Sequence, residues 1–358
     1  MAMLCPSMQE DHPFWGPFLD ALESAADSLE MDLRIHRFEG SRFDLPESAI
    51  RAIYSAEKPD YILFPYYLET GHEVLELAEK TGVTSYIVNA DIPSAEKRLL
   101  GAPGEDYSKW FGGMVPDDYM AGLLLGRELI RAAQEQGHVG SDGKVHVIAV
   151  SGGRDTSVAR ERNRGLLEAV RESQAVLDRL VHCYWDGNAA HKKVRLLFEQ
   201  GADARVIWAA SDRMALAAHK AVQECGLEAD TLVGGIDWSD PGLQAVAEGK
   251  LAVSVGGHVL EGAWGLVRMY DHWHGHPRAV PELSFSRMWT VRGSRATFVM
   301  EFMRKRFWRS CDFKRFTLTH SRKKSYSFLL EEVARACGNR SVGKSLPGSE
   351  CLLVQREN

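Results

Sequence analysis

The sequence predicts an α/β protein built from two doubly wound parallel sheets. Short runs rich in β-branched and aromatic residues alternate with longer amphipathic stretches through the first three hundred residues. This alternation is typical of parallel strands that are covered by helices on both faces. The chain has 358 residues, and at roughly 150 residues per domain it is too long for one compact core. A single sheet would need too many strands, so two α/β units are expected.

Eight short apolar segments, each bounded by turn residues, are predicted to be strands. They are Met3–Pro6, Leu33–Phe38, Tyr61–Pro65, Ser85–Asn89, Val145–Val150, Val206–Ala209, Thr231–Ile236 and Ala252–Val255. A further strand leads into a new helix at Gly112–Pro116, and we expect the first boundary between the two units there.

Amphipathic stretches between these strands are predicted to be helices. In Tyr119–Ala133 the apolar residues recur every three or four positions, which indicates one buried helix face. The other predicted helices are Phe18–Leu29, Ala49–Ala56, Glu73–Lys80, Ala159–Glu172, Lys192–Gln200, Met214–Glu224 and Val259–His272.

The composition excludes several classes of protein. The chain is 45% apolar with a formal net charge of −6, which argues against a largely disordered, fibrous or nucleic-acid-coating protein. Its six cysteines include no C-x-x-C pair, so neither a disulfide framework nor a zinc site is expected. No apolar run approaches the ~18 residues that a membrane helix needs.

The character of the sequence changes after about residue 300. Residues 301–325 carry nine Lys or Arg against Glu301 and Asp312, a net charge of +7, and five aromatic residues lie among these charges. A nucleic-acid surface is one interpretation. We favour a basic and aromatic C-terminal extension, 301–336, whose aromatic side chains anchor it while its charges face solvent. Residues 337–358 show no apolar periodicity and are expected to be a disordered tail.

Two conspicuous motifs are not expected to form functional sites. Gly338–Ser345 matches the phosphate-loop pattern G-x-x-x-x-G-K-[ST], but a helical run precedes it and Ser-Leu-Pro-Gly follows, so we expect a chance match. His272, His274 and His276 precede Pro277. Alternate residues point apart on a helix, which favours a solvated helix end over a metal site. No metal, cofactor or catalytic residue is predicted.

Polar and aromatic residues gather where predicted strands end. They are His12, Phe14, Trp15, Asn89, Asp91, Ser211, Asp237 and Trp238, and Arg162 and Trp185 belong to neighbouring segments. In open α/β sheets, ligands bind outside the carboxyl ends of the strands. Flat aromatic rings with carboxylates, amides and one arginine suit a polyhydroxylated ring, because the aromatics cover its C–H faces and the polar groups bind its hydroxyls.

Three of these motifs together resemble the ribose-type, or type I, periplasmic sugar-binding proteins over residues 2–292. They are Asp11-His12-Pro13-Phe14-Trp15, Ser211-Asp212-Arg213-Met214-Ala215-Leu216-Ala217-Ala218 and Gly234-Gly235-Ile236-Asp237. The resemblance implies two lobes joined by a hinge. The N-terminal lobe would span 1–115 and about 257–290, and the C-terminal lobe 116–256 and about 291–300.

The same resemblance implies a function. The chain would be a mature periplasmic receptor, without its signal peptide, that binds a small sugar or polyol as a monomer. It would serve the permease of an ABC importer or a membrane sensor, with no nucleic acid as partner. Two alternatives remain open: a quorum-signal or sensor-kinase-linked receptor of the same fold, and a small α/β enzyme acting on a sugar or phosphate compound. In the enzyme, Asp91 and Asp237 would be the acid–base pair and Lys344 a phosphate ligand.

The resemblance also implies roles for particular residues. Phe14, Trp15 and Trp185 would be aromatic walls, Arg162 and Asp237 the main hydroxyl-binding charges, and Asn89, Asp118 and Ser211 further polar contacts. His12, Asp91, Trp238 and His258 complete the candidate site. The family's Asp-Arg pair is replaced here by Asn89-Ala90, and the Gln expected after the return strand by Gly256-Gly257-His258.

Structural roles compete with several of these assignments. Asp212 is expected to cap its helix, and Ser211 could do the same. Arg162 could be a surface charge, Trp238 could pack at the rim, and His258 could be a partly buried histidine with its hydrogen bonds satisfied. We expect Arg162→Ala to weaken binding more than Trp15→Ala, with neither change unfolding the protein.

Overall fold

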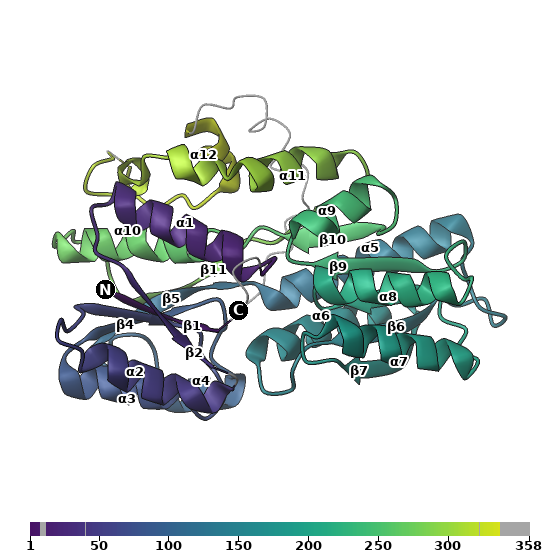
Figure 1. Ribbon diagram of the computed structural model, residues 1–358, viewed down its shortest axis with the longest axis horizontal. Helices are drawn as coiled ribbons and strands as arrows, with labels where there is room; N and C mark the ends of the chain where they lie inside the picture. The colour runs from purple at the N-terminus through teal and green to yellow at the C-terminus, as the bar shows by residue number, and fades with distance from the viewer. Residues whose placement is uncertain (8–11, 40, 322, 337–358) are drawn as a thin grey trace.

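Two six-stranded sheets lie side by side, and helices cover both faces of each (Figure 1). The computed structural model describes residues 1–7, 12–39, 41–321 and 323–336, so Asp11, the phosphate-loop match and the expected tail 337–358 lie outside the described residues. Among the described strands, only β12 pairs antiparallel with its neighbour. The prediction of two doubly wound parallel-sheet lobes joined by a hinge, with a C-terminal extension, is confirmed.

The N-terminal lobe contains a sheet of strand order β11-β5-β4-β3-β1-β2. The strands are β1 (Ala2–Pro6), β2 (Arg34–Phe38), β3 (Tyr61–Phe64), β4 (Thr84–Val88), β5 (Trp110–Pro116) and β11 (Glu282–Ser286). Its helices are α1 (Trp15–Ser28), α2 (Leu45–Ile53), α3 (Gly71–Thr81), α4 (Ser94–Leu100) and α10 (Glu261–Trp273), with a 3-10 turn at Arg42–Asp44. Successive side chains of β1 enter opposite cores, since Met3 and Cys5 face α1 and α10 while Ala2 and Leu4 face α2 and α3.

The C-terminal lobe contains a sheet of strand order β12-β10-β9-β8-β6-β7. The strands are β6 (His146–Ser151), β7 (Val176–His182), β8 (Val206–Ala209), β9 (Leu232–Ile236), β10 (Val253–Gly256) and β12 (Trp289–Val291). One face is covered by α5 (Asp118–Gln136) and α6 (Ser157–Ser173), and the other by α7 (Gly187–Glu199), α8 (Asp212–Glu224) and α9 (Asp240–Ala247). The chain passes between the sheets after β5, after β10 and after β11.

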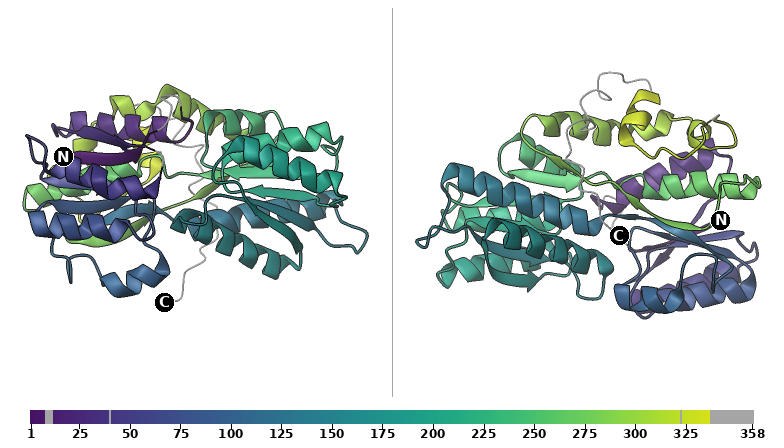
Figure 2. Two further views of the ribbon diagram at one scale, coloured as in Figure 1. Left: turned by 60° about the horizontal axis from the view of Figure 1, so that its bottom comes forward. Right: turned by 180° about the vertical axis from the view of Figure 1, so that it is seen from behind.

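The last described segment lies across both lobes, and the views from the front and from behind agree on this (Figures 1 and 2). It comprises α11 (Arg295–Lys305), 3-10 turns at Phe307–Ser310 and Phe313–Phe316, and α12 (Leu330–Ala336). Its aromatic side chains Phe302, Trp308, Phe313 and Phe316 are buried, which confirms that they anchor the extension. Its described charged side chains are exposed or half-buried, as expected, and four of them also pair with acidic side chains of the lobes.

Several elements were not predicted. The edge strand β7 leaves most of its side chains half-buried and includes Asp178 and Arg179, which interrupt its apolar run. The strands β11 and β12 and the helices α4 and α11 were also missed. The predicted solvated helix end is confirmed, because α10 ends at Trp273 and His274 is exposed. His272 itself is half-buried, and its Nδ1 lies 2.7 Å from the Tyr61 hydroxyl. None of the described helices combines the length and apolar character needed to cross a membrane.

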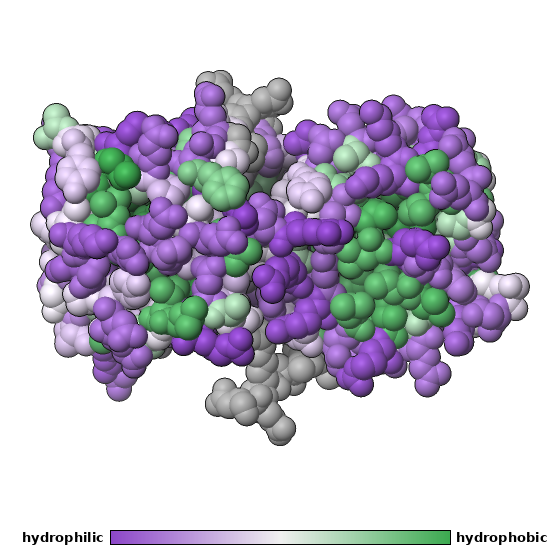
Figure 3. Space-filling model, turned by 90° about the horizontal axis from the view of Figure 1, so that it is seen from below, coloured by the Kyte–Doolittle hydropathy of each residue, from purple (hydrophilic) through white to green (hydrophobic). Residues whose placement is uncertain are grey.

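One face of the molecule is mainly hydrophilic along the boundary between the lobes, as Figure 3 shows. On the same face, apolar side chains gather over the C-terminal lobe. Exposed apolar residues in that lobe include Leu167 and Leu196.

The helices α5 and α6 approach each other more closely than side chains usually allow. A Cβ atom on Gly122 would lie 1.9 Å from the carbonyl oxygen of Arg162, and one on Gly165 would lie 2.1 Å from that of Tyr119. The carbonyl oxygen of Gly122 also accepts a hydrogen bond from Trp208 Nε1 (3.2 Å). The two glycines therefore set how deep α6, with Arg162, sits in the lobe.

Gly122→Ala should destabilise the protein, although alanine is normally the better helix residue. The methyl group has no room, and overpacking of this kind costs about 1–3 kcal/mol. Gly187→Ala, at the start of α7, is the matched control, because its nearest neighbour would be 3.5 Å away. Urea unfolding followed by circular dichroism measures both variants. Equal stability of the two would contradict the close approach of α5 and α6.

Candidate functional site

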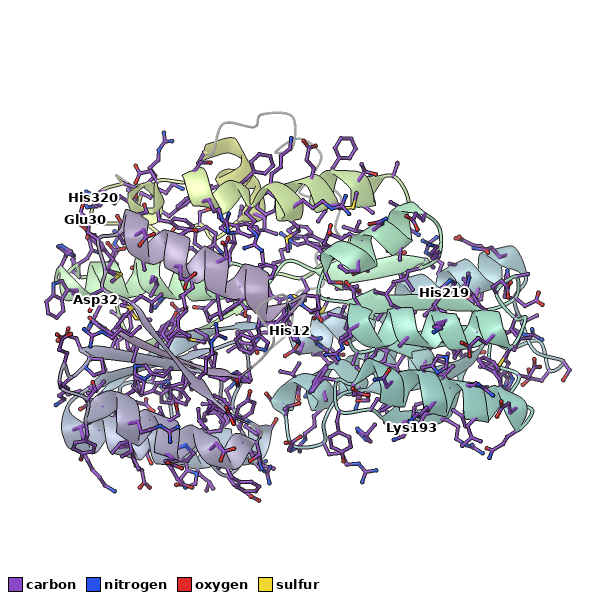
Figure 4. The ribbon with its side chains drawn as sticks, in the orientation of Figure 1. His12, Glu30, Asp32, Lys193, His219 and His320 are labelled. Carbon is purple, nitrogen blue, oxygen red and sulfur yellow. The ribbon has the colours of Figure 1, made fainter. Side chains whose placement is uncertain are left out.

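A cavity of about 160 Å³ lies between the two lobes. Nine of the twelve residues predicted from the sequence line it. They are His12, Phe14, Trp15, Asn89, Arg162, Trp185, Ser211, Asp237 and His258. His12, labelled in Figure 4, lies where the lobes meet. Pro6, Pro13, Tyr67, Ala90, Thr156, Val158, Arg213 and Ser239, which were not predicted, also line the cavity.

The N-terminal lobe contributes an aromatic wall at the start of α1. The Nδ1 atom of His12 accepts hydrogen bonds from the backbone N–H groups of Phe14 (3.3 Å) and Trp15 (3.2 Å). This bond pattern satisfies donors that a helix start leaves unpaired. The ring of Phe14 stacks on His258 with their centroids 4.9 Å apart, so the wall continues onto the segment that crosses between the lobes after β10.

Arg162 lines the side of the cavity that the C-terminal lobe forms, and the residue is only 3% exposed. Its Nε donates to Asp118 Oδ1 (2.8 Å), and its Nη1 donates to the carbonyl oxygen of Ala210 (2.6 Å) and to Asp237 Oδ1 (3.3 Å). The alternative that Arg162 is a surface helix charge is therefore wrong. One guanidinium joins the first turn of α5, the end of β8 and the loop after β9.

Burial dominates the electrostatics of this group. It raises the pKa of Asp118 to about 7 and that of Asp237 to about 6, while the neighbouring Arg162 acts in the opposite direction on both. Burial, followed by the charge of Arg162, lowers the pKa of His258 well below its ordinary value. At neutral pH the cavity therefore presents a guanidinium, the Asp237 carboxylate and a neutral imidazole.

Strained backbone marks the loops that carry the site. Asn89 (φ 65°), Trp185 (φ 65°) and Asp237 (φ 122°) all have positive φ, although none is a glycine. Such conformations cost about 1–3 kcal/mol each and gather at functional sites. All three follow strands, β4, β7 and β9, so the strain lies at the carboxyl edges of the two sheets.

Three predicted site residues do not line the cavity. Asp118 is buried behind it and holds Arg162. Asp91 lies in an ion pair with Lys97 (2.9 Å) beside a separate hollow of about 190 Å³. Trp238 is buried, and its Nε1 donates to the carbonyl oxygen of Ser254 (3.2 Å). This position is closer to the alternative prediction, in which Trp238 packs at the rim, than to the prediction that it contacts ligand.

The expectation that Asp212 caps α8 is wrong. Ser211 is the cap, since its Oγ accepts the N–H of Met214 (3.3 Å). Asp212 is fully buried and accepts hydrogen bonds from the Ser239 N–H (2.8 Å), the Ser239 hydroxyl (3.0 Å) and the Ser254 hydroxyl (2.8 Å). Burial raises the pKa of Asp212 to about 8. This carboxyl ties the loop that carries Asp237 to α8 and β10.

His258 is not the partly buried histidine with satisfied hydrogen bonds that was its alternative interpretation. It is 1% exposed, and no hydrogen-bond partner of its Nδ1 was found among the described residues. An imidazole nitrogen without a partner can bind a ligand hydroxyl. Of the missed lining residues, Tyr67 follows β3 and Thr156 follows β6, so the rule that sites form at strand ends would have found both. Within the described ranges, no cluster of ligating side chains could hold a metal ion.

Comparisons with known proteins agree with this geometry. The periplasmic binding protein domain family matches the chain over residues 4–275. The ribose import binding protein RbsB of Salmonella typhimurium is 30% identical over 142 residues, which cover 40% of this chain and 45% of that protein. RbsB of Escherichia coli is 29% identical over the same length. The chain thus spans less than half the length of these relatives.

Solved structures resemble a larger share of the chain. A periplasmic sugar-binding protein from Pseudomonas fluorescens has a TM-score of 0.79 and 26% identity, covering 91% of this chain and 96% of its own. A solute-binding protein from Actinobacillus succinogenes with bound D-allose has a TM-score of 0.71 at 18% identity, covering 83% of this chain and 98% of its own. At that identity the second likeness supports the fold alone.

The burial of Arg162 revises the expectation that its removal leaves folding intact. Arg162→Ala would leave Asp118 and Asp237 without their cation, which costs about 3–5 kcal/mol for a buried pair. The loss should be larger at pH 8 than at pH 5, because both carboxyls titrate at raised pKa values and are neutral at low pH. Chemical denaturation at the two pH values measures the loss.

Arg164→Ala, two residues along α6, is the control for this prediction. Its side chain is 56% exposed, pairs only with Glu161 among the described ion pairs and lies over the Tyr119 ring (4.6 Å), so the variant should lose no more than about 1 kcal/mol of unfolding free energy. If the two variants lose the same free energy of unfolding, the buried ion pair stabilises the protein no more than a surface pair does.

Proposed function

Because the chain belongs to the periplasmic binding protein domain family, we propose that it is a non-enzymatic receptor for a small sugar or polyol. The ligand would bind in the cavity between the lobes. The observation that carries the proposal is the convergence of Arg162, Asp237 and three aromatic side chains on one cavity. The relatives that match are binding proteins, and one of the structures most like this chain is a sugar-binding protein.

The chemistry of the cavity supports a single sugar ring. The rings of Phe14, Trp15 and Trp185 offer flat apolar faces, while Arg162 and Asp237 offer a charged donor and a charged acceptor. A volume of about 160 Å³ is below the ~300–1,000 Å³ of sites for drug-sized ligands. The position of the family's Asp-Arg pair holds Asn89 and Ala90, which argues for a ligand other than ribose.

Binding would close the lobes. Phe14 and Trp15 belong to the first lobe, whereas Arg162, Trp185 and Asp237 belong to the second. A ligand that contacts both sets favours the closed form by its differential contacts there. The three passages of the chain between the sheets would form the hinge, with lobe boundaries near residues 115, 257 and 290. The family supports a periplasmic location and delivery to an ABC permease. We propose that the receptor acts as a monomer, with a membrane sensor as the alternative partner.

Calorimetry against pentoses, hexoses and inositols tests the proposal. At least one of these should bind the wild-type protein, and Trp185→Ala should weaken it by about 1–3 kcal/mol, by analogy with other ring-on-aromatic contacts. Tyr54→Ala, which removes an exposed aromatic side chain of the N-terminal lobe (69% exposed), should bind like the wild type. The sugar proposal fails if no member of the panel binds at millimolar concentration.

Affinity should also depend on pH through Asp237. Its pKa of about 6 means that the acceptor carboxylate is present at pH 7.5 and is lost as the pH falls to 5. Affinity of the wild type should fall over this range by up to about tenfold per pH unit for one proton. Asp237→Asn should bind more weakly at pH 7.5 and lose most of the dependence, with Asp118 supplying the remainder. A variant that retains the full wild-type profile would exclude Asp237 as the titrating group.

A further inference from the structure

The C-terminal segment is attached to the C-terminal lobe through α11. We call Arg295–Phe316 the strap. The helix α11 packs on α9, and its Phe302 is buried. Arg304 donates through Nη2 to Gln244 Oε1 (2.9 Å), and its Nε forms a hydrogen bond with Asp240. Both partners belong to α9.

The next residues of the strap are attached to the N-terminal lobe. Asp20 of α1 accepts a hydrogen bond from Trp308 Nε1 (2.6 Å) and from Arg309 Nε (2.8 Å), and it pairs with Arg306 Nη1 (2.8 Å). The Asp20 side chain is only 13% exposed, whereas those of Arg306 and Arg309 are 34% and 60% exposed.

Further anchors follow along the same lobe. The N–H of Phe313 donates to the Ser28 hydroxyl (2.7 Å) at the end of α1. The rings of Phe313 and Phe316 pack on Trp264 of α10, with centroids 6.0 and 5.1 Å away. The strap therefore continues along the N-terminal lobe and does not end at its first contact.

The two attachments are separated by a single residue. Arg304 is bound to α9, Arg306 is bound to α1, and only Lys305 lies between them. An extended residue spans at most ~3.3–3.6 Å, so the backbone between the two arginines has little slack. Arg306 has a positive φ of 45°, and the helix therefore ends at the joint itself.

Both helices held by the strap begin at the candidate site. Trp15 is the first residue of α1, and Asp237 lies three residues before α9 begins. A short link between these helices limits how far the two sides of the cavity can separate.

We propose that the strap is a fourth link between the lobes that limits their opening and thereby regulates closure on the ligand. The regulatory part rests on the proposed function, whereas the mechanical part does not. A link that keeps the lobes close lowers the cost of closing, so loss of the link weakens binding.

Slack introduced at the joint tests the proposal. The variant carries six Gly/Ser residues between Lys305 and Arg306, which leaves both attachments in place. The control carries the same insertion after Ser141, within the exposed residues 141–144 of the C-terminal lobe between α5 and β6. Small-angle X-ray scattering without ligand should show a larger radius of gyration for the joint variant than for the control. Equal scattering of the two overturns the proposal.

A second variant covers the case in which the insertion prevents folding. Arg304→Gln removes the charged attachment to α9 without lengthening the chain, and it should shift the scattering in the same direction by a smaller amount. Wild-type scattering of this variant, with its folding verified by circular dichroism, also counts against the strap.

The sugar that binds the wild type provides the second readout. Couplings between sites commonly change affinity about 5–150-fold, and the joint variant should bind within that range more weakly than the control. Unchanged affinity would exclude regulation by the strap while the proposed function stands. A wild type that binds no sugar would instead contradict the proposed function, and the scattering would still decide whether the strap links the lobes.

Discussion

The ion pair of Arg162 with Asp118 and Asp237 is the interaction on which the candidate site depends. Asp118 begins α5 directly after the chain first crosses between the lobes, and Asp237 follows β9. Two buried carboxylates so close together are costly without a cation. The guanidinium is therefore needed both for the fold of the lobe and for the charge of the cavity. Its position follows from the glycine contacts that let α6 approach α5.

Another buried carboxyl group lies where the chain passes between the lobes. Glu261 begins α10, is fully buried, and accepts a hydrogen bond from the Ser286 hydroxyl at the end of β11. Burial raises the pKa of this carboxyl well above its ordinary value. The bond joins the second and third passages of the chain between the lobes. Together with the contacts of the strap to α9 and α1, this bond connects the lobes through packed and hydrogen-bonded segments.

Strand and helix alternation made most of the fold predictable, because buried parallel strands are nearly continuous apolar runs. The missed strand β7 lies at a sheet edge, where Asp178 and Arg179 are tolerated. The site residues that directly follow a strand, such as Asn89 and Asp237, could be predicted from the sequence. The local sequence could not show whether Ser211 or Asp212 caps the helix, because serine and aspartate both cap helices. The choice depends on partners distant in sequence, since Asp212 accepts a hydrogen bond from the Ser254 hydroxyl while Ser211 caps α8.

The central claim is that one ligand contacts both lobes at once. Hydrogen exchange, measured with and without the sugar that gives the largest heat in calorimetry, tests this most directly. The account predicts simultaneous protection at the start of α1 in the N-terminal lobe and at residues 156–162 and 237–243 in the C-terminal lobe. Protection confined to one lobe, or protection away from the cavity altogether, would contradict it.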